Sequence, residues 1–214
     1  MIEESSLRLR RGWTTGACAV AATKAAFTAL ITGKFPSHVS IDLPKGERPE
    51  FELHRTERGT NFSTASIIKD AGDDPDVTHG AEISVNIKPG ISGKGVIFRA
   101  GKGVGIITKA GLALEIGEPA INPTPRKMMC KIISDIAKQF NHTEDIILTI
   151  SVSGGEELAK KTWNPRLGIL GGISILGTTG VVIPYSCSAW IHSIHRGIDV
   201  AYANGLNHVA GCTG

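Results

Sequence analysis

The chain has 214 residues, of which 41% are hydrophobic and 20% are charged, so it is a folded protein of one large or two small domains and not a disordered chain. Its net charge of +3 comes from basic and acidic residues spread along the whole chain. This pattern argues against a nucleic-acid binder, which usually carries a basic stripe with stacking aromatic residues.

The first predicted element is an alanine-rich helix, with Thr14 or Thr15 as its N-cap and Gly33 at its end. From residue 38 to residue 108 apolar and polar residues alternate, which predicts a mostly antiparallel sheet. The expected strands contain Val39 to Leu43, Phe51 to Leu53, Ile83 to Ile87 and Val96 to Phe98.

A second helix is predicted from about Pro125 to Phe140, capped by Asn141, and is followed by a strand from Ile146 to Val152. A third helix from about Ser186 to Asn204, stopped by Gly205, leads into an apolar run, Leu206 to Ala210, that reads as a strand. This order predicts an α+β domain over residues 1–145 and a partial α/β domain over residues 146–214.

Two further patterns concern the cell compartment. The longest apolar stretches, such as Leu167 to Leu176, are about half of the ~20 residues that a membrane span needs, so no membrane segment is expected. The four cysteines are scattered, and no signal peptide precedes them. We therefore expect a reduced, cytoplasmic protein.

The densest glycine segment runs from Gly171 to Gly180. Counted from Gly172 it reads Gly-x-x-x-x-Gly-Thr-Thr, with Thr178 where a phosphate loop needs lysine, so a nucleoside triphosphatase is disfavoured. Its N–H groups and hydroxyls could still hold a carboxylate or a ribose. Two tight turns around a buried strand explain the pattern equally well.

A second glycine cluster extends from Gly93 to Gly105 and contains several cations, Lys102 among them. Ile106 stands where a dinucleotide-binding fingerprint requires its third glycine, so that motif is absent. Cations on glycine turns suit carboxylate binding, but a solvated hairpin with surface lysines is the favoured alternative.

Four carboxylates, on Asp70, Asp73, Asp74 and Asp76, lie within seven residues beside His79. The spacing does not match a calcium loop. One aspartate could orient a substrate group or act as a base, whereas an Asx turn, in which carboxylates bind their own backbone, is the favoured alternative.

The third helix carries His192, His195 and Asp199 at a spacing that permits a metal site. The helix-borne zinc signature is absent, so a polar stripe is favoured and no protein-bound metal is predicted. Cys18 follows a helix cap, where its pKa could be lowered, but without a histidine partner it is expected to be a small buried residue.

Several segments together resemble the cobalt-precorrin-5B C1-methyltransferases, the CbiD family, over essentially the whole chain. They are Arg11 to Ala19, Lys69 to Thr78, Gly103 to Gly111, Ile121 to Arg126 and Asn164 to Gly180. The resemblance implies an α+β part followed by a Rossmann-like part. It also implies methyl transfer from S-adenosylmethionine to C-1 of the acidic corrinoid cobalt-precorrin-5B, giving cobalt-precorrin-6A in anaerobic cobalamin biosynthesis. The cobalt belongs to the substrate, and an oligomer is possible.

For an enzyme of this family, functional residues can be assigned to three groups. Asp73 and Asp74 are the catalytic candidates, because a carboxylate could balance the sulfonium charge or accept a proton. The candidates for binding the substrate carboxylates are Lys102, Lys109, Arg126, Lys127 and Arg166. The candidates for binding the methyl donor are Gly172, Gly177, Thr178, Thr179 and Gly180.

The sequence departs from the family in one respect, since family members continue well beyond the position where this chain stops, at Gly214. We therefore expect the chain to be an N-terminal portion that binds S-adenosylmethionine weakly and methylates poorly or not at all. A non-catalytic corrinoid-binding module is the alternative.

Overall fold

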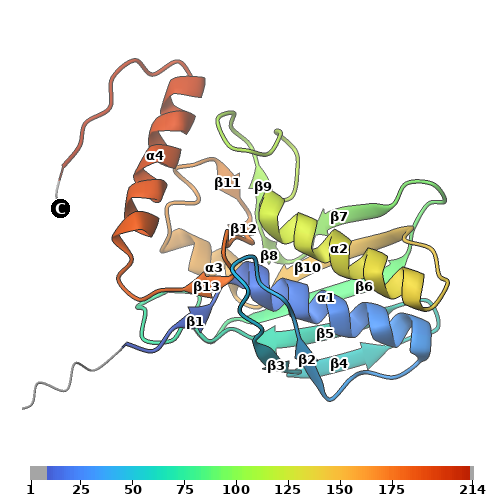
Figure 1. Cartoon of the computed structure of the whole chain (residues 1–214). Helices are drawn as coiled ribbons and strands as arrows, with labels where there is room; N and C mark the ends of the chain where they lie inside the picture. The colour runs from blue at the N-terminus through green and yellow to red at the C-terminus, as the bar shows by residue number, and fades with distance from the viewer. Residues whose placement is uncertain (1–8, 213–214) are drawn as a thin grey trace, which may run out of the picture.

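The computed structural model describes residues 9–212 and is built around one five-stranded sheet (Figure 1). All neighbouring strands are antiparallel except β10 and β7, which are parallel. In spatial order the strands are β4 (Arg55–Arg58), β5 (Ser63–Ile68), β6 (Glu82–Pro89), β10 (Ile146–Val152) and β7 (Val96–Ala100). The predicted mixture of helices with a mostly antiparallel sheet is confirmed.

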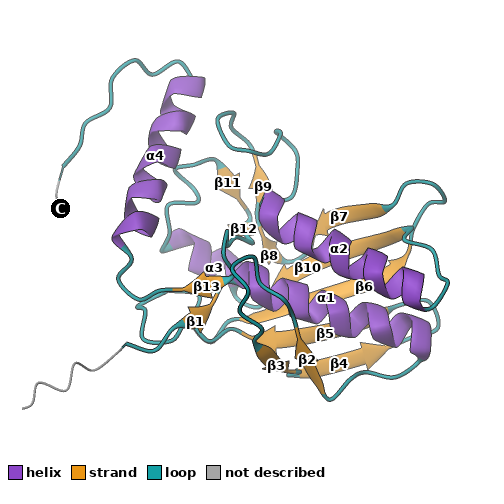
Figure 2. Ribbon diagram, in the orientation of Figure 1, coloured by secondary structure: helices purple, strands orange, loops and turns teal. Residues whose placement is uncertain are grey.

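One face of this sheet is covered by α1 (Thr15–Thr32) and α2 (Pro123–Gln139), as Figure 2 shows. The alternation along β6 and β10 turns Ile83, Val85, Leu148 and Ile150 toward the helices, where all four are fully buried. The opposite face of the sheet carries half-exposed polar side chains such as Ser84 and Thr149. The hydrophobic core therefore lies between one sheet face and two helices.

The helix α1 begins and ends where its caps predict. The Thr14 hydroxyl accepts a hydrogen bond from the backbone N–H of Ala17, and Gly33 ends the helix in the left-handed conformation, with φ 80°. The helix is long and apolar enough to cross a membrane, but 72% of that window is buried inside the protein. Its length and composition are thus explained by its place in the core.

The packing of α1 on β5 relies on small side chains. Ala65 is fully buried there, and the Ser63 hydroxyl donates a hydrogen bond to the carbonyl of Ala26. Alanines on the helix and small residues on the strand let the two backbones approach closely. Neither β5 nor its neighbour β4 is among the strands that the hydrophobic alternation predicts.

The strand β10 has the predicted bounds but lies in the middle of the sheet, between β6 and β7. A division of the chain after residue 145 would separate it from both partners. The division into residues 1–145 and 146–214 is not decided by this placement and stays a prediction.

The other helices differ from expectation in detail. Pro123 rather than Pro125 opens α2, and Asn141 follows its end with φ 50°. The short helix α3 (Gly155–Lys160) was not expected, whereas α4 (Cys187–Ala203) begins one residue after the predicted start, with Ser186 as its N-cap. The prediction of a strand over residues 206–210 is wrong, because this segment pairs with no strand among residues 9–212.

Three two-stranded pairs connect residues 169–182 to the rest of the fold, and a fourth joins two strands within residues 38–52. The pairing of β12 with β8 is parallel and the other three are antiparallel. The pairs are β1 (Gly12–Trp13) with β13 (Val181–Val182), β8 (Gly103–Val104) with β12 (Gly172–Ile173), β9 (Ile106–Ile107) with β11 (Ile169–Leu170), and β2 (His38–Ser40) with β3 (Glu50–Glu52).

Candidate active site

Three distant chain segments meet at the N-terminus of α1, and we call this place the α1 junction (residues 10–16, 69–79 and 174–186). The N–H of Trp13 donates to the carbonyl of Asp70 at 2.7 Å, and the N–H of Thr14 donates to that of Gly180 at 3.0 Å. The N–H of Gly16 donates to the carbonyl of Leu176 at 2.8 Å. The junction thus brings together three of the segments that carry the family resemblance.

Side chains also hold the junction together. The Thr15 hydroxyl accepts a hydrogen bond from the N–H of Leu176 at 3.0 Å and lies within donating distance of two carbonyls of the same segment. Gly177 approaches the Thr14 side chain so closely that a Cβ there would lie 2.2 Å from the threonine Oγ1. The first turn of α1 and the glycine segment therefore form one packed unit.

The proposed donor-binding residues fall into two groups. Gly177, Thr178, Thr179 and Gly180 lie at the junction, where the Thr178 side chain is exposed and the Thr179 hydroxyl accepts from the N–H of Val181. Gly172 lies on β12 instead, where a Cβ would come within 2.2 Å of the Gly103 carbonyl group. The two glycine clusters thus meet through close backbone packing.

Both catalytic candidates lie at the junction, and each accepts a backbone hydrogen bond. Asp73 accepts from the N–H of Arg10, and Asp74 accepts from the N–H of Tyr185 at 2.9 Å, just before α4. These contacts fix where the two carboxylates lie and leave both side chains at least partly exposed. The junction therefore holds two carboxylates by backbone contacts from two different segments.

Asp70 anchors the N-terminal side of the acidic loop. It receives two hydrogen bonds from the Arg10 guanidinium and one, at 2.9 Å, from the N–H of Gly72, as an Asx turn requires. The hydrogen bond from Arg10 lowers the pKa of Asp70 to about 2. The favoured Asx-turn interpretation is confirmed for Asp70 and also for Asp76, which accepts from the N–H of Thr78 at 2.7 Å.

A buried ion pair beneath this loop was not anticipated from the sequence. The Lys69 side chain is 1% exposed, and its Nζ lies 2.7 Å from Oδ2 of Asp76. Burial disfavours the charged form of Asp76, but the charge and hydrogen bond of Lys69 outweigh it and keep the pKa below its usual value. Only the position of Lys69 within a family-like segment pointed to it.

Cys18 lies close to this pair inside α1. It is completely buried, and burial raises its pKa to about 12. The expectation of a small, buried residue is confirmed, and an activated thiolate is excluded.

The five proposed substrate cations do not gather at one point. Arg126 is engaged: its guanidinium donates to the carbonyls of Ile121 and Pro119, pairs with Glu118 at 3.3 Å and lies over the Phe98 ring. The other four are exposed. Lys109 packs on Gly168, two residues after Arg166, so these two cations lie at the pairing of β9 with β11.

The polar stripe of α4 shows no metal-ligand arrangement. His192, His195 and Asp199 are exposed, and in the part of the chain that the structure describes no three His, Cys, Asp or Glu side chains gather as metal ligands would. The stripe faces solvent.

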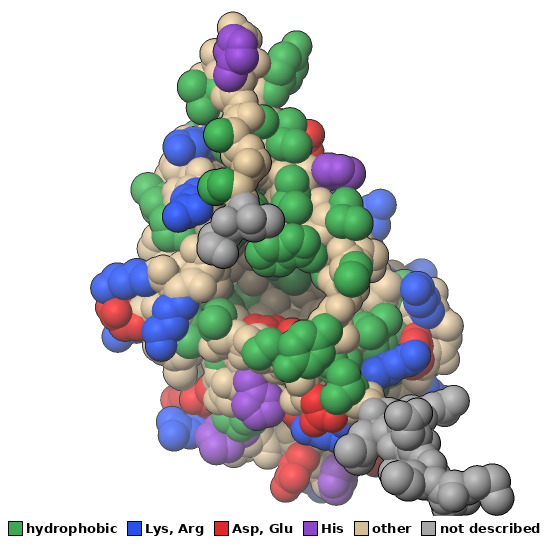
Figure 3. All heavy atoms as spheres, turned by 90° about the vertical axis from the view of Figure 1, so that its left-hand side faces the viewer, with side chains coloured by type: hydrophobic (Ala, Val, Ile, Leu, Met, Phe, Trp, Pro, Cys, Tyr) green, Lys and Arg blue, Asp and Glu red, His purple; other side chains and the backbone are tan. Residues whose placement is uncertain are grey.

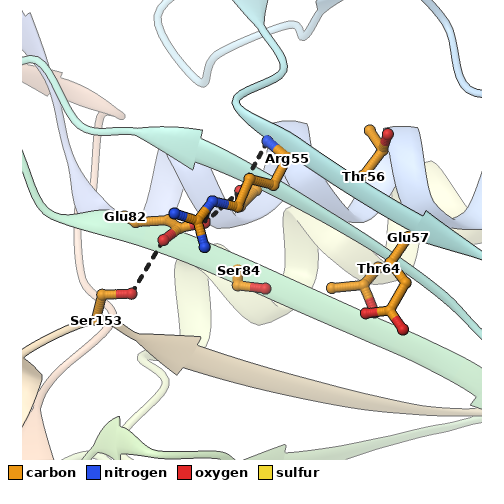
Figure 4. A pocket seen from close by; sticks show the side chains of 8 residues that line it. Arg55, Thr56, Glu57, Thr64, Glu82, Ser84 and Ser153 are labelled. Carbon is orange, nitrogen blue, oxygen red and sulfur yellow. Dashed lines mark hydrogen bonds and ion pairs between the residues drawn. The ribbon is translucent and has the colours of Figure 1, made fainter.

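A pocket of about 560 Å³ lies elsewhere, on the sheet face that the helices leave open (Figure 4). Glu82 is its central carboxylate, accepting hydrogen bonds from Ser66 and Ser153 and lying 3.8 Å from the Arg55 guanidinium. Burial opposes the charge of Glu82, but these contacts hold its pKa below the usual value. Arg55 and Glu82 pair with each other, and none of the family-like segments lines the pocket.

The comparisons with known proteins first define a class. A crystal structure titled "cobalamin biosynthesis protein (cbiD)", from Archaeoglobus fulgidus, is similar to this chain with a TM-score of 0.64 and 34% sequence identity, over 88% of this chain and 59% of that chain. The chain therefore shares the fold of the matched part of that protein. The CbiD family model matches residues 2–184, so the chain belongs to the CbiD family.

Curated relatives are more similar to this chain in sequence than the solved structure is. A protein named cobalt-precorrin-5B C(1)-methyltransferase from Brucella anthropi is 64% identical over 99% of this chain and 57% of the relative. One of the same name from Paramagnetospirillum magneticum is 63% identical over 96% of this chain and 58% of the relative. The chain thus spans somewhat more than half the length of the curated relatives it matches.

Proposed function

We propose that this chain takes part in the transfer of a methyl group from S-adenosylmethionine to C-1 of cobalt-precorrin-5B, giving cobalt-precorrin-6A, in the cytoplasm. The observation that carries the proposal is the α1 junction, where three family-like segments meet although Thr15 and its hydrogen-bond partner Leu176 are 161 residues apart. The names of the relatives support the same reaction. The proposal includes neither a nucleic-acid partner nor a resident metal.

The residues at the junction fit a sulfonium donor. S-adenosylmethionine supplies an electrophilic methyl group beside a positive charge, together with ribose hydroxyls and a carboxylate. The exposed Thr178 hydroxyl and the neighbouring backbone would hold the ribose or the carboxylate, and Asp73 and Asp74 would balance the positive charge. In-line methyl transfer mainly requires alignment and the exclusion of water, so fixed groups suffice.

The acidic substrate needs cations on the surface. Lys102, Lys109, Lys127 and Arg166 are exposed and would receive carboxylates of the corrinoid rim. Arg126 would act indirectly, because its guanidinium already binds the loop before α2. We also propose that the Rossmann-like part begins after β10, with α4 as its first long element, because β10 belongs to the central sheet.

The direct test is incubation of the purified chain with cobalt-precorrin-5B and methyl-labelled S-adenosylmethionine, analysed by mass spectrometry beside the intact Brucella anthropi relative. We expect the corrinoid to become labelled, but at a lower rate with this chain than with the relative. An unlabelled corrinoid after prolonged incubation, where the relative labels its substrate, would contradict the assignment of the activity to this chain.

Replacing both catalytic candidates, Asp73→Asn with Asp74→Asn, should slow methyl transfer by about tenfold, which corresponds to ~1.4 kcal/mol of lost transition-state stabilisation. Asparagine keeps an oxygen for the N–H donors of Arg10 and Tyr185, so the fold should be retained. Single-turnover rates measure the effect, and Asp42→Asn, at an exposed site outside the junction, is the matched control. Unchanged turnover in a folded double variant would remove both aspartates from the proposed mechanism.

A further inference from the structure

The helix α4 has an apolar side with little packed against it. Of its 17 residues only Val200 is buried. Trp190 meets Trp163 edge to face at 5.9 Å, and the Asn204 side chain binds the carbonyl of Ala110, but Tyr202 remains 78% exposed. In Figure 1 this helix stands apart from the layer of α1 and α2.

The exposed apolar residues of α4 form one continuous stripe. Four members are successively four residues apart and the fifth, Ile191, lies three residues before Ile194, which places them on one face of the helix. They are Trp190, Ile191, Ile194, Ile198 and Tyr202. Helical stability in proteins comes mostly from packing of such a face, so a free stripe of this length is unusual.

The stripe continues onto the segment before α4. Leu176, Ile183 and Tyr185 are 46%, 49% and 68% exposed. Together with the stripe they form what we call the α4 patch. Figure 3 looks at this side of the molecule and shows hydrophobic side chains gathered above and below a hollow. Exposed apolar side chains gathered on one side of a protein mark interaction sites.

We infer that the α4 patch is the docking surface for the part of the CbiD chain that the relatives carry outside their match with this chain. That part is roughly two-fifths of the Brucella anthropi relative and of the Archaeoglobus fulgidus protein. In the relatives it belongs to the same polypeptide, so its effective concentration at the patch is high and it outcompetes a second copy. The inference rests on family membership and not on the proposed reaction.

The α4 patch borders the α1 junction. Tyr185 belongs to the patch, and its N–H binds Asp74 of the α1 junction. A segment docked on the patch therefore borders the junction and shields that side from water.

The test compares amide hydrogen exchange in two intact proteins. In this chain the amides of α4 should exchange readily. The matching segment of the complete Brucella anthropi relative should exchange at least about 100-fold more slowly, because opening it there requires undocking. Equal rates in the two proteins, whether fast or slow, would overturn the inference.

Variants of the relative separate docking from general stability. The substitutions equivalent to Ile194→Asp and Ile198→Asp should restore fast exchange in that segment, whereas the equivalent of His192→Asp, at an exposed position on a side of the helix away from Ile194 and Ile198, should leave it slow. Sedimentation of this chain over a range of concentrations should show a monomer. A dimer that Ile194→Asp abolishes would assign the patch to a second copy and overturn the inference.

Discussion

Replacing Gly172 with alanine should lower the free energy of unfolding by about 3 kcal/mol or more, even without any ligand. A Cβ at this position would lie 2.2 Å from the Gly103 carbonyl group and 2.6 Å from the N–H nitrogen of Val104. These are backbone atoms of the paired strand β8, so neither can move without breaking the parallel pairing. Overpacking against backbone belongs to the most destabilising class of substitutions. Denaturant unfolding measures the loss.

The neighbouring Gly171→Ala variant is the matched control. Gly171 has φ 84° but nothing within 4 Å of its Cβ position, so alanine there should cost only ~1 to 2 kcal/mol of backbone strain. If Gly172→Ala kept full stability and instead lost affinity for S-adenosylmethionine, Gly172 would be a ligand contact, and the packing explanation would be wrong.

The second large effect concerns the buried pair beneath the acidic loop. Asp76→Asn should cost about 3 to 5 kcal/mol of unfolding free energy, because it leaves the Lys69 ammonium unpaired in the interior. The same change at Asp135, whose partner Lys131 is exposed, should cost less than about 1 kcal/mol. Lys69→Met combined with Asp76→Asn should recover part of the loss, since no buried charge then remains. An equal loss of unfolding free energy for Asp76→Asn and Asp135→Asn would contradict the assignment of Lys69 and Asp76 as a buried ion pair.

The pH dependence of stability gives an independent check of this pair. The pKa of Asp76 is lower in the folded protein than in the unfolded chain, so its contribution is fully present above about pH 4, the usual unfolded value, and is lost as the pH falls below it. The wild-type chain should therefore lose more stability than Asp76→Asn between pH 5 and pH 2. An equal loss of stability in the two proteins would show that protonation of Asp76 does not contribute to the pH dependence of folding.

Elements with strong local signals were predictable from the sequence. Thr14 and Gly33 marked the ends of α1, the alternation from Ile146 to Val152 gave the bounds of β10, and Ser186 marked the start of α4. The strand β5 was not predicted because its buried side includes Ser63 and Ala65, which are small enough to pack against the alanines of α1. Hydrophobic alternation carries little signal where packing depends on small residues.

The candidate site was predictable only in pieces. The acidic loop and the Gly171 to Gly180 segment were both singled out, but nothing local shows that Thr15 binds Leu176 or that Asp74 binds Tyr185. Such contacts follow from tertiary structure, as does the burial of Lys69. The sequence also does not show that the guanidinium of Arg126 binds the loop before α2. Arg126 was therefore predicted to bind the substrate.

The proposed function places the methyl donor at the α1 junction, next to the corrinoid whose carboxylates the exposed cations receive. It is tested most directly by amide hydrogen exchange of this chain with and without cobalt-precorrin-5B, and then with S-adenosylmethionine added. We expect residues 10–16, 69–79 and 174–186 to become protected together, and residues 55–66 and 82–84, around the pocket on the open face of the sheet, to stay unprotected. Protection confined to that pocket, or no protection at the junction, would contradict it.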